Sequence, residues 1–302
     1  MVRHFLEVDD LSADELLQVL DLAEQAEPTL ALTRQTVGLL FEKPSARTRH
    51  SMEVATVQLG GHPVYVRNDE VGLDERESVE DITKVFGGYH ALIAARVFEH
   101  SKLTRAASVS TVPIINLLSD ESHPIQALAD LLTLRQEFGS LEGLVVTYVG
   151  DGNNVAKSLA MGVHLSGGTF RIAHPADYGF PQHVLDEFAA KGVPIFATTD
   201  PVEAVAGADA IYTDAWYSMG QEEEAALREP VFAPYQVNAE LMAHAKPTAI
   251  FLHCLPAHRG HEATDEVLDG PQSRIFPLAH NRLYSARGLM SFLLAEADKG
   301  NA

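Results

Sequence analysis

Several short segments of the sequence combine side chains suited to binding a small anion. In Ser45-Ala46-Arg47-Thr48-Arg49, hydroxyl, guanidinium and backbone N–H groups could hold a phosphate at the start of a helix. Basic residues in a first helical turn oppose the helix dipole, so a bound anion would explain their presence. A capped helix with two solvated arginines is the alternative interpretation.

Two further segments carry groups suited to a carbonyl or to developing charge. Arg96 ends an apolar run, where a charge without a partner would be costly, although an edge salt bridge would also explain it. His123 and Gln126 flank Pro124 at the start of a helical pattern. An imidazole beside an amide can hydrogen-bond a carbonyl group, while a purely structural histidine is the alternative.

The second half of the chain has a glycine-rich turn. Residues 150–154 read Gly-Asp-Gly-Asn-Asn, close to the dinucleotide fingerprint Gly-x-Gly-x-x-Gly, but Val155 takes the place of the last glycine. Asn153 and Asn154 could instead hold a carboxylate at a helix N-terminus, or form a plain turn and cap.

Two other segments of this half carry reactive side chains. Residues 214–234 begin with an aspartate and show no regular period, which predicts a binding loop in which Trp216 and Tyr217 could equally be packing anchors. His253 and Cys254 follow an apolar run, but one histidine and one cysteine are too few for a zinc site. Cys254 could line a ligand site or be a plain buried residue.

The elements that must position these groups follow from the alternation of short apolar runs with helical-period segments, which predicts an α/β fold with two doubly wound parallel sheets. The expected strands are residues 36–41, 63–66, 91–95 and 112–117, then 144–149, 169–173, 194–197, 210–213 and 249–252. The expected helices include one capped by Ser12 and Glu15, one over 47–59, a long domain-joining helix over 124–138 and a terminal helix over 281–297. Because ligands bind beyond the carboxyl ends of parallel strands, the polar segments predict one site shared by both halves.

Composition excludes several classes of protein. The 302 residues are 46% hydrophobic and 21% charged, which is typical of a folded protein with two domains. A formal net charge of −20 disfavours nucleic acid and anionic lipid as partners. Cys254 is the only cysteine, and no run approaches the roughly 18 apolar residues of a membrane helix. We therefore expect no membrane association and a cytoplasmic location.

As a set, the segments beginning at Ser45, His123, Gly150, Asp214 and His253 resemble the ornithine branch of the aspartate/ornithine carbamoyltransferase family, and the likeness runs from the first predicted helix to the last. The resemblance implies a carbamoyl phosphate-binding domain over 1–134, completed by a returning helix at 283–302, and an ornithine-binding domain over 135–282. It implies carbamoyl transfer to the δ-amine of L-ornithine, giving L-citrulline and phosphate in arginine biosynthesis or, in reverse, catabolism. It also implies a homotrimer or a multiple of trimers, with sites near subunit interfaces and without a metal or other cofactor.

The resemblance assigns roles by position. The carbamoyl phosphate-binding set would be Ser45, Ala46, Arg47, Thr48, Arg96, His123, Gln126, Cys254, Leu255 and Arg282. The ornithine-binding set would be Asn154, Asp214, Ser218 and Met219. The catalytic residues would be Arg96, His123, Gln126, Asp214 and Cys254.

Four positions depart from the family's usual pattern. Ala46 stands in place of threonine, His100 in place of glutamine, His280 in place of glutamate, and Gly72 where a polar residue often reaches a neighbouring subunit's site. These departures keep open a related carbamoyltransferase with another amine acceptor. The turn at residues 150–154 keeps open a nucleotide-binding oxidoreductase or a non-catalytic ligand-binding protein.

Overall fold

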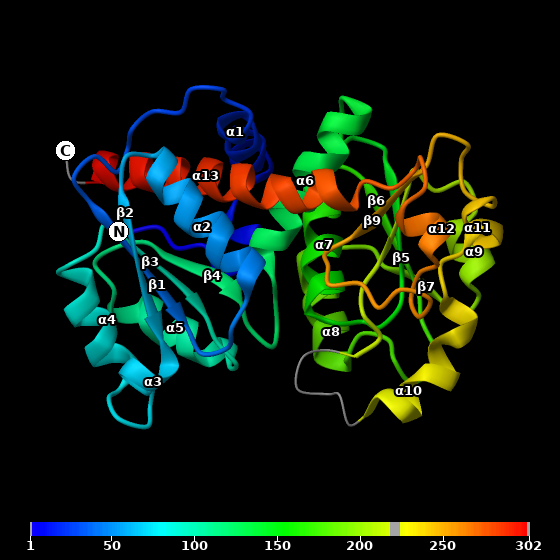
Figure 1. The fold of residues 1–302 in the computed structure, drawn as a ribbon, viewed down its shortest axis with the longest axis horizontal. Helices are drawn as coiled ribbons and strands as arrows, with labels where there is room; N and C mark the ends of the chain where they lie inside the picture. Colours follow the sequence, from blue (N-terminus) through cyan, green and yellow to red (C-terminus); the bar gives the residue numbers. More distant parts are fainter. Residues whose placement is uncertain (1, 218–223, 301–302) are drawn as a thin grey trace. The chain divides into compact units, whose positions relative to one another are not determined.

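The chain forms two compact units, each built on a parallel sheet. The computed structural model describes residues 2–217 and 224–300. Unit 1 comprises Met1–Leu132 and His280–Ala302, and unit 2 comprises Thr133–Ala279. Within the described residues, unit 1 has a four-stranded sheet and unit 2 a five-stranded sheet (Figure 1). The predicted α/β class is confirmed.

The sheet of unit 1 has the strand order β2-β1-β3-β4, and all its pairings are parallel. Its strands are β1 (Thr36–Phe41), β2 (His62–Arg67), β3 (Leu92–Arg96) and β4 (Ile114–Leu118). All five residues of β3 are buried, as expected of a central parallel strand covered on both faces. The chain leaves β1 for one side of the sheet and β3 for the other, so the order reverses between these two strands.

Helices cover both faces of this sheet. The helices that lie wholly in unit 1 are η1 (Val8–Asp10), α1 (Ala13–Ala23), α2 (Ala46–Gln58), α3 (Asn68–Val71), α4 (Val79–Gly87) and α5 (His100–Val109). Helices α6 (Pro124–Phe138) and α13 (Ile275–Gly300) contain the points where the chain passes between units. Helices α1, α2 and α13 lie on one face, and α4 and α5 lie on the other (Figure 1).

The sequence signals for two of these helices agree with the structure, and a third helix begins earlier than predicted. Ser12 and Glu15 form the predicted capping box of α1. Helix α6 has the predicted bounds, with Pro124 as its first residue. Helix α13 begins at Ile275, earlier than the predicted residue 281, because a proline at position 277 is tolerated in a first turn.

Helix α13 packs closely against α1 at a glycine. A Cβ built on Gly288 would lie 2.4 Å from the backbone oxygen of Val19 and 2.7 Å from the backbone nitrogen of Ala23. Both neighbours are backbone atoms, so they cannot move aside as a flexible side chain would. The glycine therefore lets the C-terminal helix approach the first helix within unit 1.

We expect Gly288→Ala to lower the free energy of unfolding by about 2 kcal/mol, the usual cost of forcing an extra group into a close-packed contact. The measurement is the midpoint of urea denaturation followed by circular dichroism. Ser291→Ala, half-buried on the same helix, is the matched control and should shift the midpoint little. An unchanged midpoint for Gly288→Ala would show that α1 and α13 separate without cost.

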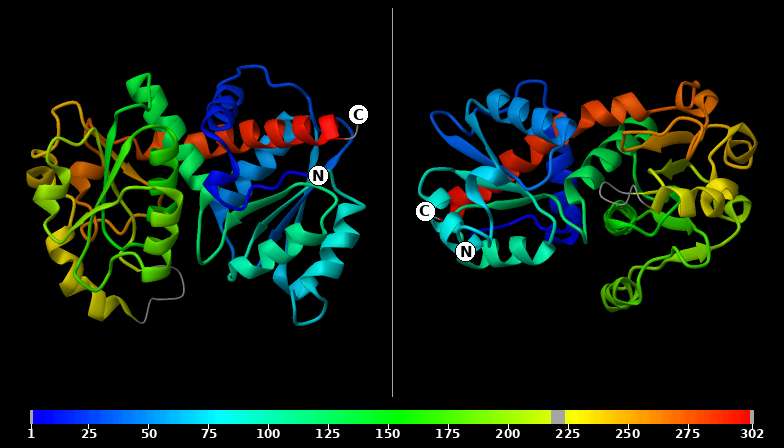
Figure 2. Two further views of the ribbon diagram at one scale, coloured as in Figure 1. Left: turned by 180° about the vertical axis from the view of Figure 1, so that it is seen from behind. Right: turned by 60° about the horizontal axis from the view of Figure 1, so that its bottom comes forward.

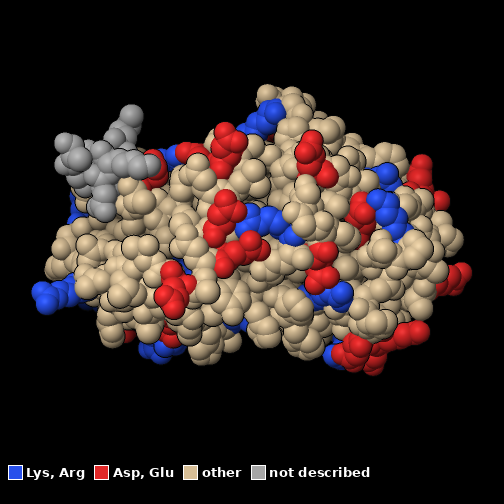
Figure 3. Space-filling view, turned by 90° about the horizontal axis from the view of Figure 1, so that it is seen from above, with Lys and Arg blue, Asp and Glu red and all other residues tan. Residues whose placement is uncertain are grey.

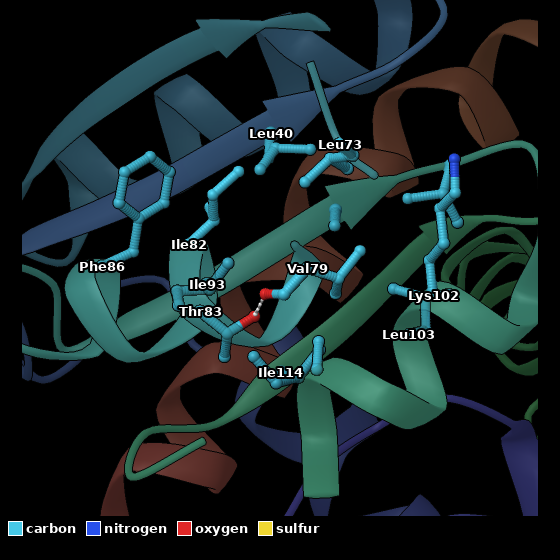
Figure 4. A pocket seen from close by; sticks show the side chains of 13 residues that line it. Leu40, Leu73, Val79, Ile82, Thr83, Phe86, Ile93, Lys102, Leu103 and Ile114 are labelled. Carbon is cyan, nitrogen blue, oxygen red and sulfur yellow. Dashed lines mark hydrogen bonds between the residues drawn. The ribbon is translucent and has the colours of Figure 1, made fainter. Parts of the chain in front are cut away.

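An apolar pocket lies between the sheet and α4 and α5 in unit 1 (Figure 4). Its lining includes Leu40, Ile82 and Ile93, and the Thr83 hydroxyl near it donates to the Val79 carbonyl at 2.7 Å. At the edge of the pocket, the Lys102 ammonium binds Glu42 at 2.7 Å. A lining of this kind does not suit a phosphorylated or zwitterionic substrate.

The sheet of unit 2 has the order β7-β6-β5-β8-β9, again with parallel pairings throughout. Its strands are β5 (Val145–Val149), β6 (Thr169–Ala173), β7 (Phe196–Thr198), β8 (Ala210–Thr213) and β9 (Ile250–His253). The chain passes from β5 to β6 on one side and later to β8 on the other. The strand order therefore reverses between β5 and β8.

The helices of unit 2 form two layers. They are α7 (Asn154–Leu165), α8 (Gln182–Lys191), α9 (Pro201–Val205), α10 (Ala225–Phe232), η3 (Ala233–Tyr235), α11 (Ala239–Met242) and α12 (Asp265–Leu268). Helices α7 and α8 cover one face, while α9, α11 and α12 pack their apolar residues against the other, as the views in Figure 2 show.

One sequence expectation for this unit is wrong. The stretch 214–234 was expected to be loop throughout, but α10 and η3 occupy its later part. Pro230 lies inside α10 and hides the helical period from sequence inspection. Arg228 of α10 is held by tertiary contacts to Asp151 at 2.6 Å and to the Trp216 carbonyl at 3.1 Å, which local propensity does not reveal.

Charge is distributed over the surface. On the face drawn in Figure 3, acidic side chains lie beside basic ones, so the formal charge of −20 does not form a single acidic patch there. Among the described residues, no helix is both long enough and apolar enough to cross a membrane.

Candidate active site

In unit 1, the predicted site residues gather at the carboxyl edge of the sheet. Phe41, the last residue of β1, lies opposite Arg96, the last residue of β3, so the segments that follow these strands start side by side. This is also where the strand order reverses, the position at which doubly wound sheets bind ligands.

The first segment leads into α2. Ser45 is the N-cap of this helix, and its hydroxyl oxygen accepts a hydrogen bond from the Thr48 N–H at 3.4 Å. The Ser45 hydroxyl also donates to the Thr48 hydroxyl at 3.1 Å. Thr48 is buried, whereas Ala46 and Arg47 are exposed. The first turn therefore offers backbone N–H groups, two hydroxyls and one guanidinium to an anion.

Arg282 of α13 connects this turn to α6. Its guanidinium donates to the Thr48 hydroxyl at 2.7 Å and to the Gln126 side-chain oxygen at 2.5 Å. The Gln126 amide nitrogen donates in turn to Asp130 at 2.8 Å. A guanidinium on one side and a carboxylate on the other fix which way the Gln126 amide points. Asp130 was not identified from the sequence, because its role appears only through this contact.

Cationic groups are concentrated around His123. Burial lowers the pKa of His123 well below its ordinary value, and the charges of Arg282, Arg96 and Lys43 lower it further. His123 is therefore a neutral imidazole near pH 7. Arg96 is itself buried, with 4% of its surface exposed. Several cations gathered at one sheet edge favour the binding of an anion there, so this cluster indicates an anion site.

Lys43 belongs to this cluster and was missed in the sequence. Burial first, and the neighbouring Arg96 second, lower the pKa of Lys43 to about 8, while Asp120 and Glu42 oppose the shift. Its ammonium lies 4.8 Å from the centre of the Phe98 ring. The available signal was its place in the segment between β1 and the Ser45 cap.

The pKa of Lys43 predicts pH-dependent anion binding. A bound dianion favours the protonated lysine, so phosphate binding near pH 8 should take up a proton, and affinity should fall by up to about tenfold per pH unit above that pH. Calorimetry with inorganic phosphate between about pH 7.5 and 9.5, in buffers of different ionisation enthalpy, measures both effects. Lys43→Met should abolish the proton uptake, and Lys43→Arg should bind without the pH dependence. Equal uptake by Lys43→Met would assign the titration to another group.

In unit 2, polar residues follow the carboxyl ends of three strands. Thr213, the last residue of β8, lies opposite His253, the last residue of β9, which places Asp214 beside Cys254. The Cys254 thiol donates to Asp214 Oδ1 at 3.0 Å, and the Ala215 N–H donates to the same oxygen at 2.8 Å.

The turn after β5 supplies the other contact to this carboxylate. The Asn153 amide nitrogen donates to Asp214 Oδ2 at 3.4 Å, while the Asn153 side-chain oxygen caps α7. The Tyr148 hydroxyl donates to this Asn153 side-chain oxygen at 3.4 Å. Burial raises the pKa of Tyr148 well above its ordinary value. Asn154 is the first residue of α7.

The glycines of this turn serve the chain's own packing. Gly150 has φ 148°, a conformation that side chains rarely adopt. A Cβ on Gly152 would lie 2.5 Å from the backbone nitrogen of Phe180. In the dinucleotide fingerprint the second glycine lets a pyrophosphate come close to the backbone, but here the backbone of residues 179–180 occupies the space beside Gly152. The turn therefore does not support nucleotide binding.

The remaining predicted residues divide as follows. Cys254 is buried and Leu255 is half-buried, and both lie in the turn after β9 in unit 2. Ser218 and Met219 lie outside the described residues. Among the described residues, oxygen, nitrogen and sulfur atoms of Asp214, His253 and Cys254 lie within 4.8 Å of one another, as do those of Glu7, His100 and Glu121.

Comparison with known proteins identifies the family. The description "Aspartate/ornithine carbamoyltransferase, carbamoyl-P binding domain" matches residues 3–136, and "Aspartate/ornithine carbamoyltransferase, Asp/Orn binding domain" matches residues 142–293. The chain is 46% identical over 296 residues to an ornithine carbamoyltransferase of Thermus thermophilus, covering 97% of each protein. It is 43% identical over 296 residues to that of Haloquadratum walsbyi, covering 97% of this chain and 98% of the relative. The structure of ornithine carbamoyltransferase from Pyrococcus furiosus superposes with a TM-score of 0.92 at 41% identity, covering 97% of each chain.

Two doubly wound sheets with polar groups at their switch points define an α/β protein that binds small ligands at sheet edges. The family matches span most of the chain, so the chain belongs to the aspartate/ornithine carbamoyltransferase family. The resemblance predicted from the motifs is confirmed.

Proposed function

We propose that the protein transfers the carbamoyl group of carbamoyl phosphate to the δ-amine of L-ornithine, giving L-citrulline and phosphate. The observation that carries the proposal is the buried cationic edge of unit 1, where the charges of Arg96 and Arg282 act on a neutral His123. A dianionic phosphate ester suits such an edge. Membership of the family, and the name ornithine carbamoyltransferase of the relatives described above, support this donor and acceptor.

Unit 1 is proposed to bind the donor. Ser45, Arg47 and Thr48, together with the N–H of Ala46, would hold the phosphate at the start of α2. Arg96, His123 and Gln126 would contact the carbamoyl group, which their hydrogen-bonding groups suit. Arg282 would act twice, by its charge and by holding Thr48 and Gln126 in place.

Unit 2 is proposed to bind the acceptor. The Asp214 carboxylate suits the ammonium group of an amino acid, and the amide of Asn154 suits its carboxylate. Ser218 and Met219 are proposed to complete this set. Cys254 and the Leu255 carbonyl would border the path of the attacking amine and the carbamoyl group.

The reaction requires an unprotonated amine and stabilisation of developing negative charge. The δ-nitrogen attacks the carbonyl carbon, a C–N bond forms, the bond from that carbon to the phosphate oxygen breaks, and phosphate leaves with the electron pair while the amine proton passes to solvent. Carbamoyl phosphate already carries a good leaving group, so this step calls for no electron transfer and no Lewis acid. Arg96 and Arg282 would stabilise the charge on the tetrahedral intermediate and the departing phosphate.

The four departures from the family pattern motivate a second candidate, a carbamoyltransferase with another amine acceptor. Ala46 is exposed at the first position of α2 and still provides its N–H. Gly72 ends α3 with φ 56°, so the backbone there favours glycine. His100 is buried, with its Nδ1 2.9 Å from the Ser119 hydroxyl, and His280 is exposed.

A steady-state acceptor screen decides between the two candidates. Carbamoylated product is measured with carbamoyl phosphate at millimolar concentration and ornithine, lysine, putrescine or aspartate as the amine. The highest kcat/KM with ornithine supports the proposed reaction. A higher value with another amine favours the second candidate, and no citrulline at millimolar substrates would contradict the proposal.

We also propose a homotrimer, or a multiple of trimers, in the cytoplasm. The exposed apolar residues Val54 and Val57 of α2 support burial of this helix against another copy. Light scattering coupled to gel filtration should give a mass of three chains or a multiple of three. A monomer at micromolar concentration would contradict the proposed assembly.

A further inference from the structure

A buried carboxylate lies at the cationic edge of unit 1. Glu42 follows β1 and precedes Lys43, and 3% of its side chain is exposed. Its Oε1 accepts a hydrogen bond from the Lys102 ammonium of α5 at 2.7 Å, and its Oε2 accepts the Phe98 N–H at 2.7 Å. Its own N–H donates to the Arg96 carbonyl at 2.9 Å. Glu42 therefore binds both the end of β3 and the segment that follows this strand.

Phe98 is held from two sides by its backbone. Glu42 accepts its N–H, and its carbonyl accepts the Asp120 N–H at 2.9 Å from the segment that leads into α6. Phe98 is 52% exposed, so packing alone does not fix its ring, yet the Lys43 ammonium lies over that ring at 4.8 Å from its centre. A cation is attracted to an aromatic face at this distance. The two backbone contacts therefore place the ring where Lys43 can use it.

Glu42 also balances charge at this edge. Burial and the charge of Arg96 lower the pKa of Lys43, whereas Asp120 and Glu42 raise it. Lys43 in turn acts on His123, whose pKa is lowered first by burial and then by the surrounding cations. Without the negative charge of Glu42, Lys43 would be protonated less often near pH 8, and a neutral lysine adds no positive charge to an anion site.

We infer that Glu42 is a positioning residue for carbamoyl phosphate binding, holding the Phe98 backbone and the Lys43 ammonium in place at the cationic edge. The inference deepens the proposed function and rests on it for the identity of the donor. An ion pair with Lys102 does not by itself explain the carboxylate, because apolar side chains of similar size often replace a buried ion pair without loss of stability. The pocket beside Lys102 has an apolar lining that would accept such a replacement (Figure 4).

Two double variants separate the ion pair from the positioning role. Both carry Lys102→Met, and they differ in having Glu42→Gln or Glu42→Leu, so only the first keeps an acceptor for the Phe98 N–H. Thermal midpoints of both should stay within about 5 °C of the parent's, because the whole pair is removed. Calorimetry at about pH 7.5 should show inorganic phosphate bound at least about fivefold more weakly by the Glu42→Leu protein than by the Glu42→Gln protein.

The single variant Glu42→Gln tests the charge. The pH above which phosphate affinity falls should move down by at least about half a pH unit, because a carboxylate no longer raises the pKa of Lys43. Glu80→Gln is the matched control, since Glu80 pairs with Arg105 of the same helix α5 at 2.6 Å and is not among the groups that act on Lys43. It should change neither the affinity nor its pH dependence.

Amide hydrogen exchange reports on the Phe98 backbone without any ligand. The Phe98 N–H should exchange at least about tenfold faster in the Glu42→Leu double variant than in the Glu42→Gln one. Equal phosphate affinity in the two double variants overturns the inference, as does a parent-like pH dependence in Glu42→Gln. Because glutamine is nearly the size of glutamate, that second result decides the question even if the Glu42→Leu protein does not fold. If the parent forms no citrulline, the proposed function fails, while phosphate binding and amide exchange still decide the role of Glu42.

Discussion

Arg96→Ala should lower kcat/KM for carbamoyl phosphate by at least about tenfold, and by about 100-fold if Arg96 stabilises the charge that develops on the carbonyl oxygen. Arg96 ends a fully buried strand opposite Phe41, so it lies at the sheet edge between β1 and β3, where the strand order reverses. Its charge acts on two neighbours, because it contributes to lowering the pKa of both His123 and Lys43. The positive charge that disfavours protonation of these two groups would stabilise an anion bound beside them.

The experiment combines steady-state kinetics with thermal unfolding. Global stability should change little, because the substitution also relieves the repulsion between Arg96 and Lys43. Arg96→Lys keeps a charge but loses the planar fork, and should recover part of the rate. Arg105→Ala is the matched control and should leave kinetics unchanged, because Arg105 is a half-buried arginine paired with Asp74 and Glu80. A parent-like rate for Arg96→Ala would remove Arg96 from the site.

The sheets were predictable because their strands are apolar runs separated by helical patterns. The predicted bounds of β1, β6 and β8 match the structure. The edge strand β7 was placed at 194–197 but spans Phe196–Thr198, since two of its three residues are exposed and leave little apolar signal. Helices α3, α11 and α12 have four residues each, too few to show a helical period.

The candidate site was predictable in residue types but not in connections. The cap by Ser45 is local and readable, since it spans three residues. The contact of Arg282 with Thr48 joins residues separated by 234 positions, and only the fold reveals it. Asp130 and Glu42 belong to the same category, because each is a buried carboxylate whose partner lies on another turn or segment.

Lys43 shows a different limit of sequence reasoning. Its position was visible within the segment that joins β1 to α2, but an isolated lysine in a sequence carries its ordinary pKa of about 10.5. Only burial and the charge of Arg96 bring the value to about 8. Electrostatic coupling among groups on different strands is a property of the assembled sheet edge, and composition or spacing does not specify it.

Asp214→Asn should lower kcat/KM for ornithine by about 100-fold, the upper range expected for losing a hydrogen-bonded charge pair. The carboxylate is held in place by the Ala215 N–H at 2.8 Å, the Cys254 thiol at 3.0 Å and the Asn153 amide at 3.4 Å. Asparagine is nearly the same size and retains an acceptor oxygen for the Ala215 N–H and the Cys254 thiol, losing only the longer contact from the Asn153 amide. The main loss is therefore the negative charge that would pair with the substrate's ammonium group.

Phosphate binding, measured on the same variant, shows whether the loss is confined to the ornithine site. Asp214 belongs to unit 2, so the dissociation constant for inorganic phosphate, proposed to bind in unit 1, should remain that of the parent. Asp209→Asn is the matched control, because Asp209 lies before β8, at the opposite end of the strand from Asp214, and pairs with Lys246 at 2.7 Å. It should leave both substrate constants unchanged. If Asp214→Asn retains the parent's kcat/KM for ornithine, the ammonium group binds elsewhere, and the acceptor set proposed for unit 2 must be reassigned.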